Sequence, residues 1–117
     1  MKAFAKRLPG CFGVLQILLI LLVPVEVLGA DGEYYLVIQD HRFQPVELKI
    51  PAGKKIKLII ENRDATPEEF ESHALKREKV IPGKSSASIF IGPLKPGRYP
   101  FVGEFNEKTA KGVISAE

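Results

Sequence analysis

The chain has 117 residues, of which 45% are hydrophobic and 26% are charged, and its formal net charge is +3. This length supports one hydrophobic core, so the sequence predicts a single globular domain. Beyond residue 30 the chain carries 14 basic and 13 acidic side chains, a balance that lacks the basic surface of nucleic-acid-binding proteins and excludes that class.

The N-terminal segment has the layout of a secretory signal peptide. Three basic residues precede an apolar run over residues 11–25, and about 15 apolar residues are fewer than the roughly 20 that a membrane-spanning helix needs. We expect residues 1–30 to form a signal peptide that is cleaved after Ala30; an uncleaved N-terminal anchor is the alternative. In both cases residues 31–117 are expected in the periplasm or another extracytoplasmic compartment.

Short segments rich in β-branched and aromatic residues follow, separated by turns that contain Gly, Pro, Asn and Asp. This spacing is typical of an all-β sandwich or barrel. Apolar and charged residues alternate most strictly over residues 46–50 and 55–61, which predicts one buried and one solvated face for each strand. The six predicted strands cover residues 34–39, 46–50, 55–61, 86–91, 97–102 and 112–116.

The stretch from residue 63 to residue 84 breaks this pattern, because it is long, highly charged and poor in alternation. Within it, Thr66-Pro67-Glu68-Glu69 has the composition of a helix start, since Thr caps free N–H groups and Pro is favoured in the first turn. We therefore predict a crossover with a short helix around residues 66–80. The predicted fold class is all-β, a Greek-key β-sandwich with this one helix.

The order of these features resembles that of cupredoxin-like domains. FQPVELKIPAGKKIKLIIENRD, residues 43–64, is similar to the opening strands of that family, and PLKPGRYPF, residues 93–101, is similar to its penultimate strand. The resemblance spans nearly all of residues 34–117 and implies a cupredoxin-like sandwich.

Within that family, EEFESHALKREKVIPGK, residues 68–84, and the GEF loop at residues 103–105 most resemble EfeO-type cupredoxin-like domains, which are associated with bacterial iron uptake. This resemblance implies an iron or copper ion as cofactor. It also implies an inner-membrane iron permease, or another periplasmic iron-uptake component, as partner.

Ligand chemistry excludes a type 1 blue-copper centre, which needs one Cys thiolate and two His ligands, commonly with an axial Met. The only cysteine and the only methionine of the chain lie in the predicted signal peptide. By the resemblance, Gly103 and Asn106 occupy the positions of the cysteine and the downstream histidine. Glu68 and Glu69 stand where the upstream histidine would be.

Oxygen donors with one imidazole remain as candidate ligands. In a sandwich of this type the loop after the third strand and the last loop lie at one end, so Glu69 or Glu71 is expected to face Glu104. Carboxylates with one imidazole suit iron or manganese and accept Cu(II). The predicted metal ligands are Glu69, Glu71, His73 and Glu104, with Glu68, Glu78 and Glu107 as secondary candidates. The alternative is an ordinary solvated surface of paired charges.

Local conformation decides how these acids are arranged. If residues 69–71 are extended, Glu69 and Glu71 share one face and Phe70 is buried on the other, whereas a helix would separate the two acids. Asn106 is expected to hydrogen-bond groups around an ion and not to ligate it. His41 is expected to be a turn or surface residue.

Two functions from different classes follow. The sequence contains no nucleophile with a placed base, no phosphate-binding glycine loop and no paired-histidine zinc motif, and oxidation of ferrous iron at a bound metal is the one reaction left open. The first function is an exported metal-binding module that handles iron or copper in periplasmic iron uptake. The second is a metal-free protein-interaction domain on a cupredoxin scaffold.

Overall fold

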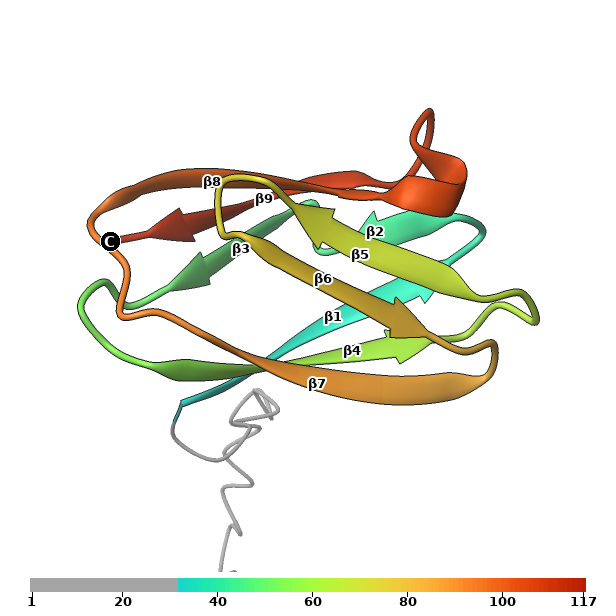
Figure 1. The fold of residues 1–117 in the computed structure, drawn as a ribbon, viewed down its shortest axis with the longest axis horizontal. Coiled ribbons are helices and arrows are strands. Elements are labelled where there is room, and N and C mark those ends of the chain that lie inside the picture. The colour runs from blue at the N-terminus through green and yellow to red at the C-terminus, as the bar shows by residue number, and fades with distance from the viewer. Residues whose placement is uncertain (1–31) are drawn as a thin grey trace, which may run out of the picture.

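Residues 32–117 are described by the structure, a computed structural model, and they form two β-sheets packed face to face (Figure 1). The predicted signal peptide lies outside the described residues. The strands are β1 (Glu33–Gln39), β2 (Arg42–Gln44), β3 (Glu47–Ile50), β4 (Ile56–Asn62), β5 (Glu68–Ser72), β6 (Arg77–Ile81), β7 (Ser85–Ile91), β8 (Gly97–Gly103) and β9 (Lys111–Ala116). A single 3-10 turn, η1 (Glu104–Asn106), follows β8. Over residues 32–117, no helix has the length and apolar character needed to cross a membrane.

The two sheets have four and five strands. Their orders are β2-β1-β4-β7 and β3-β9-β8-β5-β6. The pairs β1–β4 and β3–β9 run parallel, and the other pairs are antiparallel. Because β5 and β8 are neighbours, the loops that precede β5 and follow β8 meet at one end of the sandwich.

Alternation along each strand sends apolar side chains into the space between the sheets. Phe43 of β2 lies at the centre of an aromatic cluster, with its ring centroid 4.9 Å from that of Phe101 and 6.2 Å from that of Phe70. The rings of Phe70 and Phe101 are 5.0 Å apart. These three residues come from both sheets and are at most 2% exposed, so they join the sheets next to the end that carries η1.

The predicted all-β sandwich is confirmed, and the predicted helix around residues 66–80 is wrong. That stretch forms the β5–β6 hairpin, in which Glu71 lies opposite Glu78. Burial alternates along β5 as in any half-buried strand, but two of the inward positions, Glu68 and Ser72, are polar. The alternation of β5 could not be recognised in the sequence, because only one of its inward positions is apolar.

Val46 also differs from expectation, since it lies just before β3 and is 65% exposed and outside the core. Its carbonyl oxygen accepts a hydrogen bond from the backbone N–H of Val113 at 2.9 Å. All described strands pair with partners inside residues 32–117, which also contain the hydrophobic core. This stretch therefore has the contacts that a unit needs to fold on its own.

Candidate functional site

Glu68 is the first residue of β5, and its side chain points into the sandwich, where it is 1% exposed. Its Oε1 accepts hydrogen bonds from the backbone N–H groups of Glu69 (3.0 Å) and Phe105 (2.9 Å). Its Oε2 accepts a hydrogen bond from Nδ2 of Asn106 at 2.7 Å. A carboxylate can be buried at tolerable cost only when such donors replace water. The Glu68 carboxylate thus ties the start of β5 to η1.

Asn62 holds the loop that leads into Glu68. Its buried amide donates hydrogen bonds to the carbonyl oxygens of Thr66 (2.9 Å) and Ile81 (3.1 Å). Its Oδ1 accepts a hydrogen bond from the backbone N–H of Asp64 at 3.0 Å. The amide therefore replaces the backbone pairing that this loop lacks, and it fixes the direction in which β5 begins.

Gly103, the last residue of β8, is packed directly against the Glu68 carboxylate. A Cβ atom at residue 103 would lie 2.6 Å from Cδ of Glu68 and 2.7 Å from Cβ of Ala110. Both separations are far shorter than van der Waals contact. Residue 103 must therefore lack a side chain while Glu68 keeps its position.

Glu69 and Glu71 lie on the opposite, solvent-facing side of β5, with Phe70 buried between them. The extended alternative for residues 69–71 is therefore correct. Glu104, at the start of η1, approaches both carboxyl groups. We call Glu69, Glu71, Glu78 and Glu104 the carboxylate cluster.

The carboxylate cluster makes Glu69 and Glu71 harder to ionise. Partial loss of contact with water is the largest cause that raises the pKa of Glu69, followed by a hydrogen bond and charge repulsion from Glu104. The hydrogen bond to Glu104 is the largest cause that raises the pKa of Glu71, and desolvation adds to it. Glu78 repels both of these groups. A cation placed here would relieve this repulsion.

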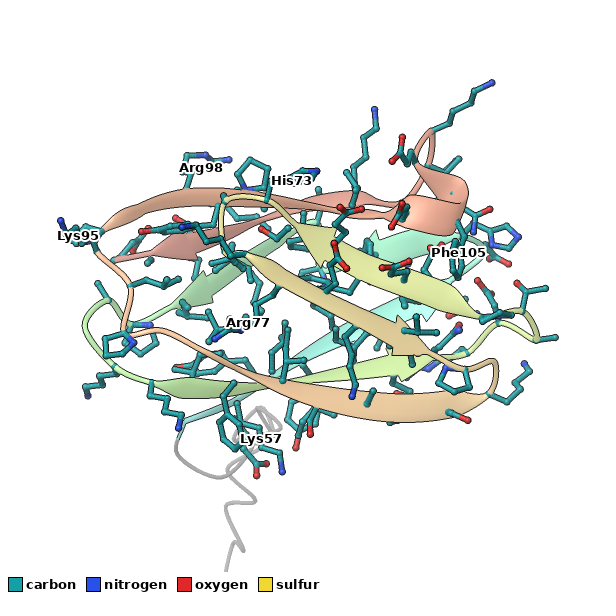
Figure 2. The ribbon with its side chains drawn as sticks, in the orientation of Figure 1. Lys57, His73, Arg77, Lys95, Arg98 and Phe105 are labelled. Carbon is teal, nitrogen blue, oxygen red and sulfur yellow. The ribbon has the colours of Figure 1, made fainter. Side chains whose placement is uncertain are left out.

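The other predicted ligands are more dispersed. His73, at the β5–β6 turn, is 93% exposed and places Nε2 at 3.4 Å from Oε1 of Glu71. Glu107 is exposed in the loop after η1. In Figure 2, His73 and Phe105 lie toward different ends of the upper sheet. In the conformation described for residues 32–117, no group of three or more His, Cys, Asp or Glu side chains is arranged to hold a metal ion.

His41 is a turn residue, as expected. It and Asp40 have left-handed backbones, with φ values of 56° and 53°. The Asp64 carboxylate accepts hydrogen bonds from the N–H groups of Asp40 (2.8 Å) and His41 (3.0 Å), and the second of these is the largest cause that lowers the pKa of Asp64. The hydroxyl of Thr109 donates to the carbonyl oxygen of His41 at 2.6 Å. These bonds attach the β1–β2 turn to the loop that follows η1.

The inward role of Glu68 was not identified from the sequence, where it was only a secondary metal candidate. One signal was present: Glu68, Phe70 and Ser72 have the spacing of residues on one strand face. Once Phe70 is taken as core, the same alternation places Glu68 inside.

Comparison with known proteins agrees with this architecture. A sequence model described as "Cupredoxin-like domain" matches residues 13–116. The chain belongs to the cupredoxin-like domain family. It is 40% identical to the uncharacterized protein RP394 of Rickettsia prowazekii (strain Madrid E), and the similarity covers 86% of this chain and 88% of that one.

Solved structures with similar folds include copper proteins. The reduced state of an amicyanin mutant has a TM-score of 0.61 at 18% identity, covering 78% of this chain and 88% of the other. Auracyanin A, a "blue" copper protein from Chloroflexus aurantiacus, has a TM-score of 0.62 at 11% identity, covering 73% and 98%. A chain of a heme-copper terminal oxidase dimer has a TM-score of 0.62 at 20% identity, with coverage of 75% of this chain and 66% of that one. At these identities the similarity establishes the cupredoxin fold.

The residues at the interior position do not fit a type 1 copper ion. Glu68, Gly103 and Asn106, which the sequence resemblance placed at the positions of its strong ligands, offer a carboxylate, no side chain and an amide, whereas the ion requires thiolate and imidazole. Both oxygens of the Glu68 carboxylate already accept hydrogen bonds from the protein. These three residues therefore supply neither the thiolate nor the imidazoles that a type 1 copper ion needs.

Glu104→Gln is expected to stabilise the domain at neutral pH, because it removes charge repulsion from Glu69 and Glu71. The pKa values of these two groups are raised above the ordinary 4.5 in the folded state. The contribution of these two groups to the free energy of unfolding is therefore complete below about pH 4.5, where both are protonated. It is lost as the pH rises through their folded-state pKa values. In thermal unfolding measured across this pH range, the melting temperature of the variant should rise relative to that of the wild type as the pH rises.

Glu107→Gln is the matched control, because it removes an exposed carboxylate of the same loop that does not raise the pKa of Glu69 or Glu71. Its stability should follow that of the wild type across the same pH range. An identical pH dependence for Glu104→Gln and Glu107→Gln would show that the cluster does not interact as described.

Proposed function

We propose that this protein is an exported module that binds an iron or copper ion at the carboxylate cluster and serves bacterial iron uptake. The crowding of Glu104 against Glu69 and Glu71 is the observation that carries the proposal. Glu104 raises the pKa values of Glu69 and Glu71, and on such a surface a cation replaces a repulsion with an attraction. Glu78 and Glu104 are exposed, so their carboxylates can also change rotamer at little cost when an ion arrives.

The donor types favour a hard or intermediate ion. Carboxylate oxygens with one imidazole suit Fe(II), Fe(III) or Mn(II) and accept Cu(II), whereas Cu(I) prefers sulfur. His73 supports this selection because its ring is exposed and already contacts Glu71. Binding and delivery of the ion need no further group, whereas oxidation of ferrous iron would need an electron acceptor.

The role in iron uptake rests on the likeness of residues 68–84 and of the GEF loop to EfeO-type domains. Location outside the cytoplasm rests on the basic and apolar N-terminal segment. An inner-membrane iron permease, or another periplasmic iron-uptake component, is the partner that would receive the ion.

Calorimetric titration of residues 32–117 with Fe(II) under anaerobic conditions, Fe(III), Mn(II) and Cu(II) tests the proposal. We expect saturable binding of at least one ion, weakened on the order of tenfold or more in Glu69→Gln and in Glu104→Gln, because each loses a charged ligand. Since protons compete for the same oxygens, the affinity should fall on acidification.

Glu33→Gln is the control for the titration, since Glu33 lies on the other sheet and outside the cluster. It should bind as the wild type does. Absence of saturable heat with all four ions would refute metal binding, and binding that survives both cluster substitutions would place the site elsewhere.

A metal-free interaction domain is the second candidate, and Phe105 favours it. This side chain is 52% exposed on η1, next to a hollow of about 550 Å³ that His41, Glu107 and Thr109 help to line. Exposed aromatic residues on loops are frequent anchors of protein interfaces. Under this alternative none of the four ions binds.

A further inference from the structure

Four lysines of this domain gather at the end opposite η1. Lys54 and Lys55 lie in the β3–β4 turn, Lys57 follows at the start of β4, and Lys95 lies in the β7–β8 loop. The two loops are packed together, because the N–H of Gly53 donates to the carbonyl oxygen of Leu94 at 2.8 Å. We call Lys54, Lys55, Lys57 and Lys95 the basic end; Figure 2 shows Lys95 at one extremity of the sandwich and Phe105 toward the other.

The charges of the basic end are not neutralised by ion pairs within the described part of the chain. The four ion pairs found there involve other residues. Glu33 lies opposite Lys57 in the register of β1 and β4, and the backbone of Glu117 bonds to that of Ala52, so two glutamates accompany the four lysines at this end. The carboxylate cluster lies toward η1, so the domain has a basic and an acidic end.

An exposed aromatic side chain lies beside these lysines. Phe90, on the outer face of β7, is 54% exposed, and Nζ of Lys55 is 4.7 Å from the centre of its ring. Lys57 lies opposite Phe90 in the register of β4 and β7. Lysines next to an exposed aromatic ring suit the headgroup region of a lipid bilayer. The lysines can contact the lipid phosphates, and the ring can enter the boundary between the headgroups and the acyl chains.

The chain joins the sandwich at this same end. The carbonyl oxygen of Gly32 accepts a hydrogen bond from the backbone N–H of Lys57 at 2.7 Å. Six residues separate the apolar run over residues 11–25 from Gly32, and the connection from residue 25 to residue 32 can span at most about 25 Å. When the apolar run is retained in a membrane, the basic end must therefore lie close to the membrane surface.

We propose that, in the uncleaved form of the protein, whose residues 11–25 anchor it in a membrane, the basic end docks on the anionic lipid headgroups of that membrane, and the acidic end with its carboxylate cluster faces away from the bilayer. Lys54, Lys55 and Lys95 are exposed and supply the phosphate contacts. Attachment by so short a connection holds them at high local concentration near the headgroups. Neither end needs a bound metal ion for this orientation, so the docking is independent of the proposed function.

Fluorescence quenching on the full chain in lipid nanodiscs tests the orientation. Cys11→Ser removes the native thiol, and a dye is attached through either Pro96→Cys at the basic end or Glu107→Cys at the acidic end. We expect brominated lipids to quench the dye at residue 96 in discs of phosphatidylcholine with phosphatidylglycerol, several-fold more than in pure phosphatidylcholine. The dye at residue 107 should stay unquenched in both.

Charge reversal separates docking from mere proximity. The combined variant Lys54→Glu, Lys55→Glu, Lys95→Glu should abolish the extra quenching, and Lys79→Glu, Lys108→Glu, Lys111→Glu, which changes the charge equally elsewhere, should retain it. Equal quenching in neutral and anionic discs, or no effect of the first variant, would overturn the proposal.

A second measurement covers the case in which the full chain does not insert. Residues 32–117 are sedimented with phosphatidylglycerol-rich or pure phosphatidylcholine vesicles at low ionic strength. We expect preference for the anionic vesicles, lowered on the order of a hundredfold by the triple reversal at the basic end and removed by high salt. Equal sedimentation with both vesicles would contradict docking.

Discussion

The Glu68→Leu variant is expected to lose about 3 kcal/mol of unfolding free energy. A leucine, which is apolar and similar in size to glutamate, would suit most buried positions, but it does not suit this one. The substitution leaves three donors without acceptors: the N–H groups of Glu69 and Phe105, and the amide of Asn106. These donors are partly buried, and a donor left unpaired away from water costs more than an ordinary hydrogen bond contributes. Chemical denaturation of residues 32–117 measures the loss.

Two further variants define what Glu68 does. Glu68→Gln keeps one acceptor oxygen and the side-chain shape, so we expect a smaller loss of about 1 kcal/mol. Glu69→Leu, at the neighbouring solvent-facing position, should not destabilise the domain, because it removes a carboxylate that Glu104 repels. If Glu68→Leu is as stable as Glu69→Leu, the buried carboxylate does not link β5 to η1.

Chemical rescue distinguishes lost hydrogen bonds from lost packing. Glu68→Ala leaves the same donors around an empty volume, which a small carboxylate from solution can occupy. Formate should therefore raise the melting temperature of Glu68→Ala but not that of the wild type. Chloride at equal ionic strength is the control, since it cannot offer two oxygen acceptors.

Much of the sandwich could be predicted because alternation and turn chemistry are local signals. Ile56 and Leu58, for example, face the core with the charged Lys57 between them, and both are at most 1% exposed. The β5–β6 hairpin could not be predicted in the same way. Glu68 and Ser72 are buried polar residues, and sequence patterns treat polar residues as exposed.

The partners that make this burial tolerable are distant in sequence. Phe105 and Asn106 lie 37 and 38 residues after Glu68, and Ser72 donates a hydrogen bond to the carbonyl oxygen of Pro100 at 2.7 Å. A local pattern carries no information about such pairs. The proximity of Glu69, Glu71 and Glu104, in contrast, followed from alternation along one strand and from the end of the sandwich at which two loops meet.

Gly103→Ala is expected to destabilise the domain by about 3 kcal/mol, through a clash and not through a lost contact. The added methyl group would overlap Cδ of Glu68 and Cβ of Ala110, at 2.6 Å and 2.7 Å. Neither neighbour can withdraw easily, because Glu68 is held by hydrogen bonds and Ala110 is fully buried. Denaturation of Gly103→Ala and of Gly97→Ala gives the comparison.

Gly97→Ala is the matched control, because the nearest atom to a Cβ at residue 97 is 3.7 Å away, an ordinary contact. It should change stability by less than about 1 kcal/mol. Combining Gly103→Ala with Glu68→Ala should cost less than the sum of the two changes, since the second substitution removes one of the two overlapping groups. Strict additivity would show that the side chain of Glu68 does not occupy the space beside residue 103. The same overlap applies to the Cβ of a cysteine, so a thiol introduced at residue 103 would also meet the side chains of Glu68 and Ala110.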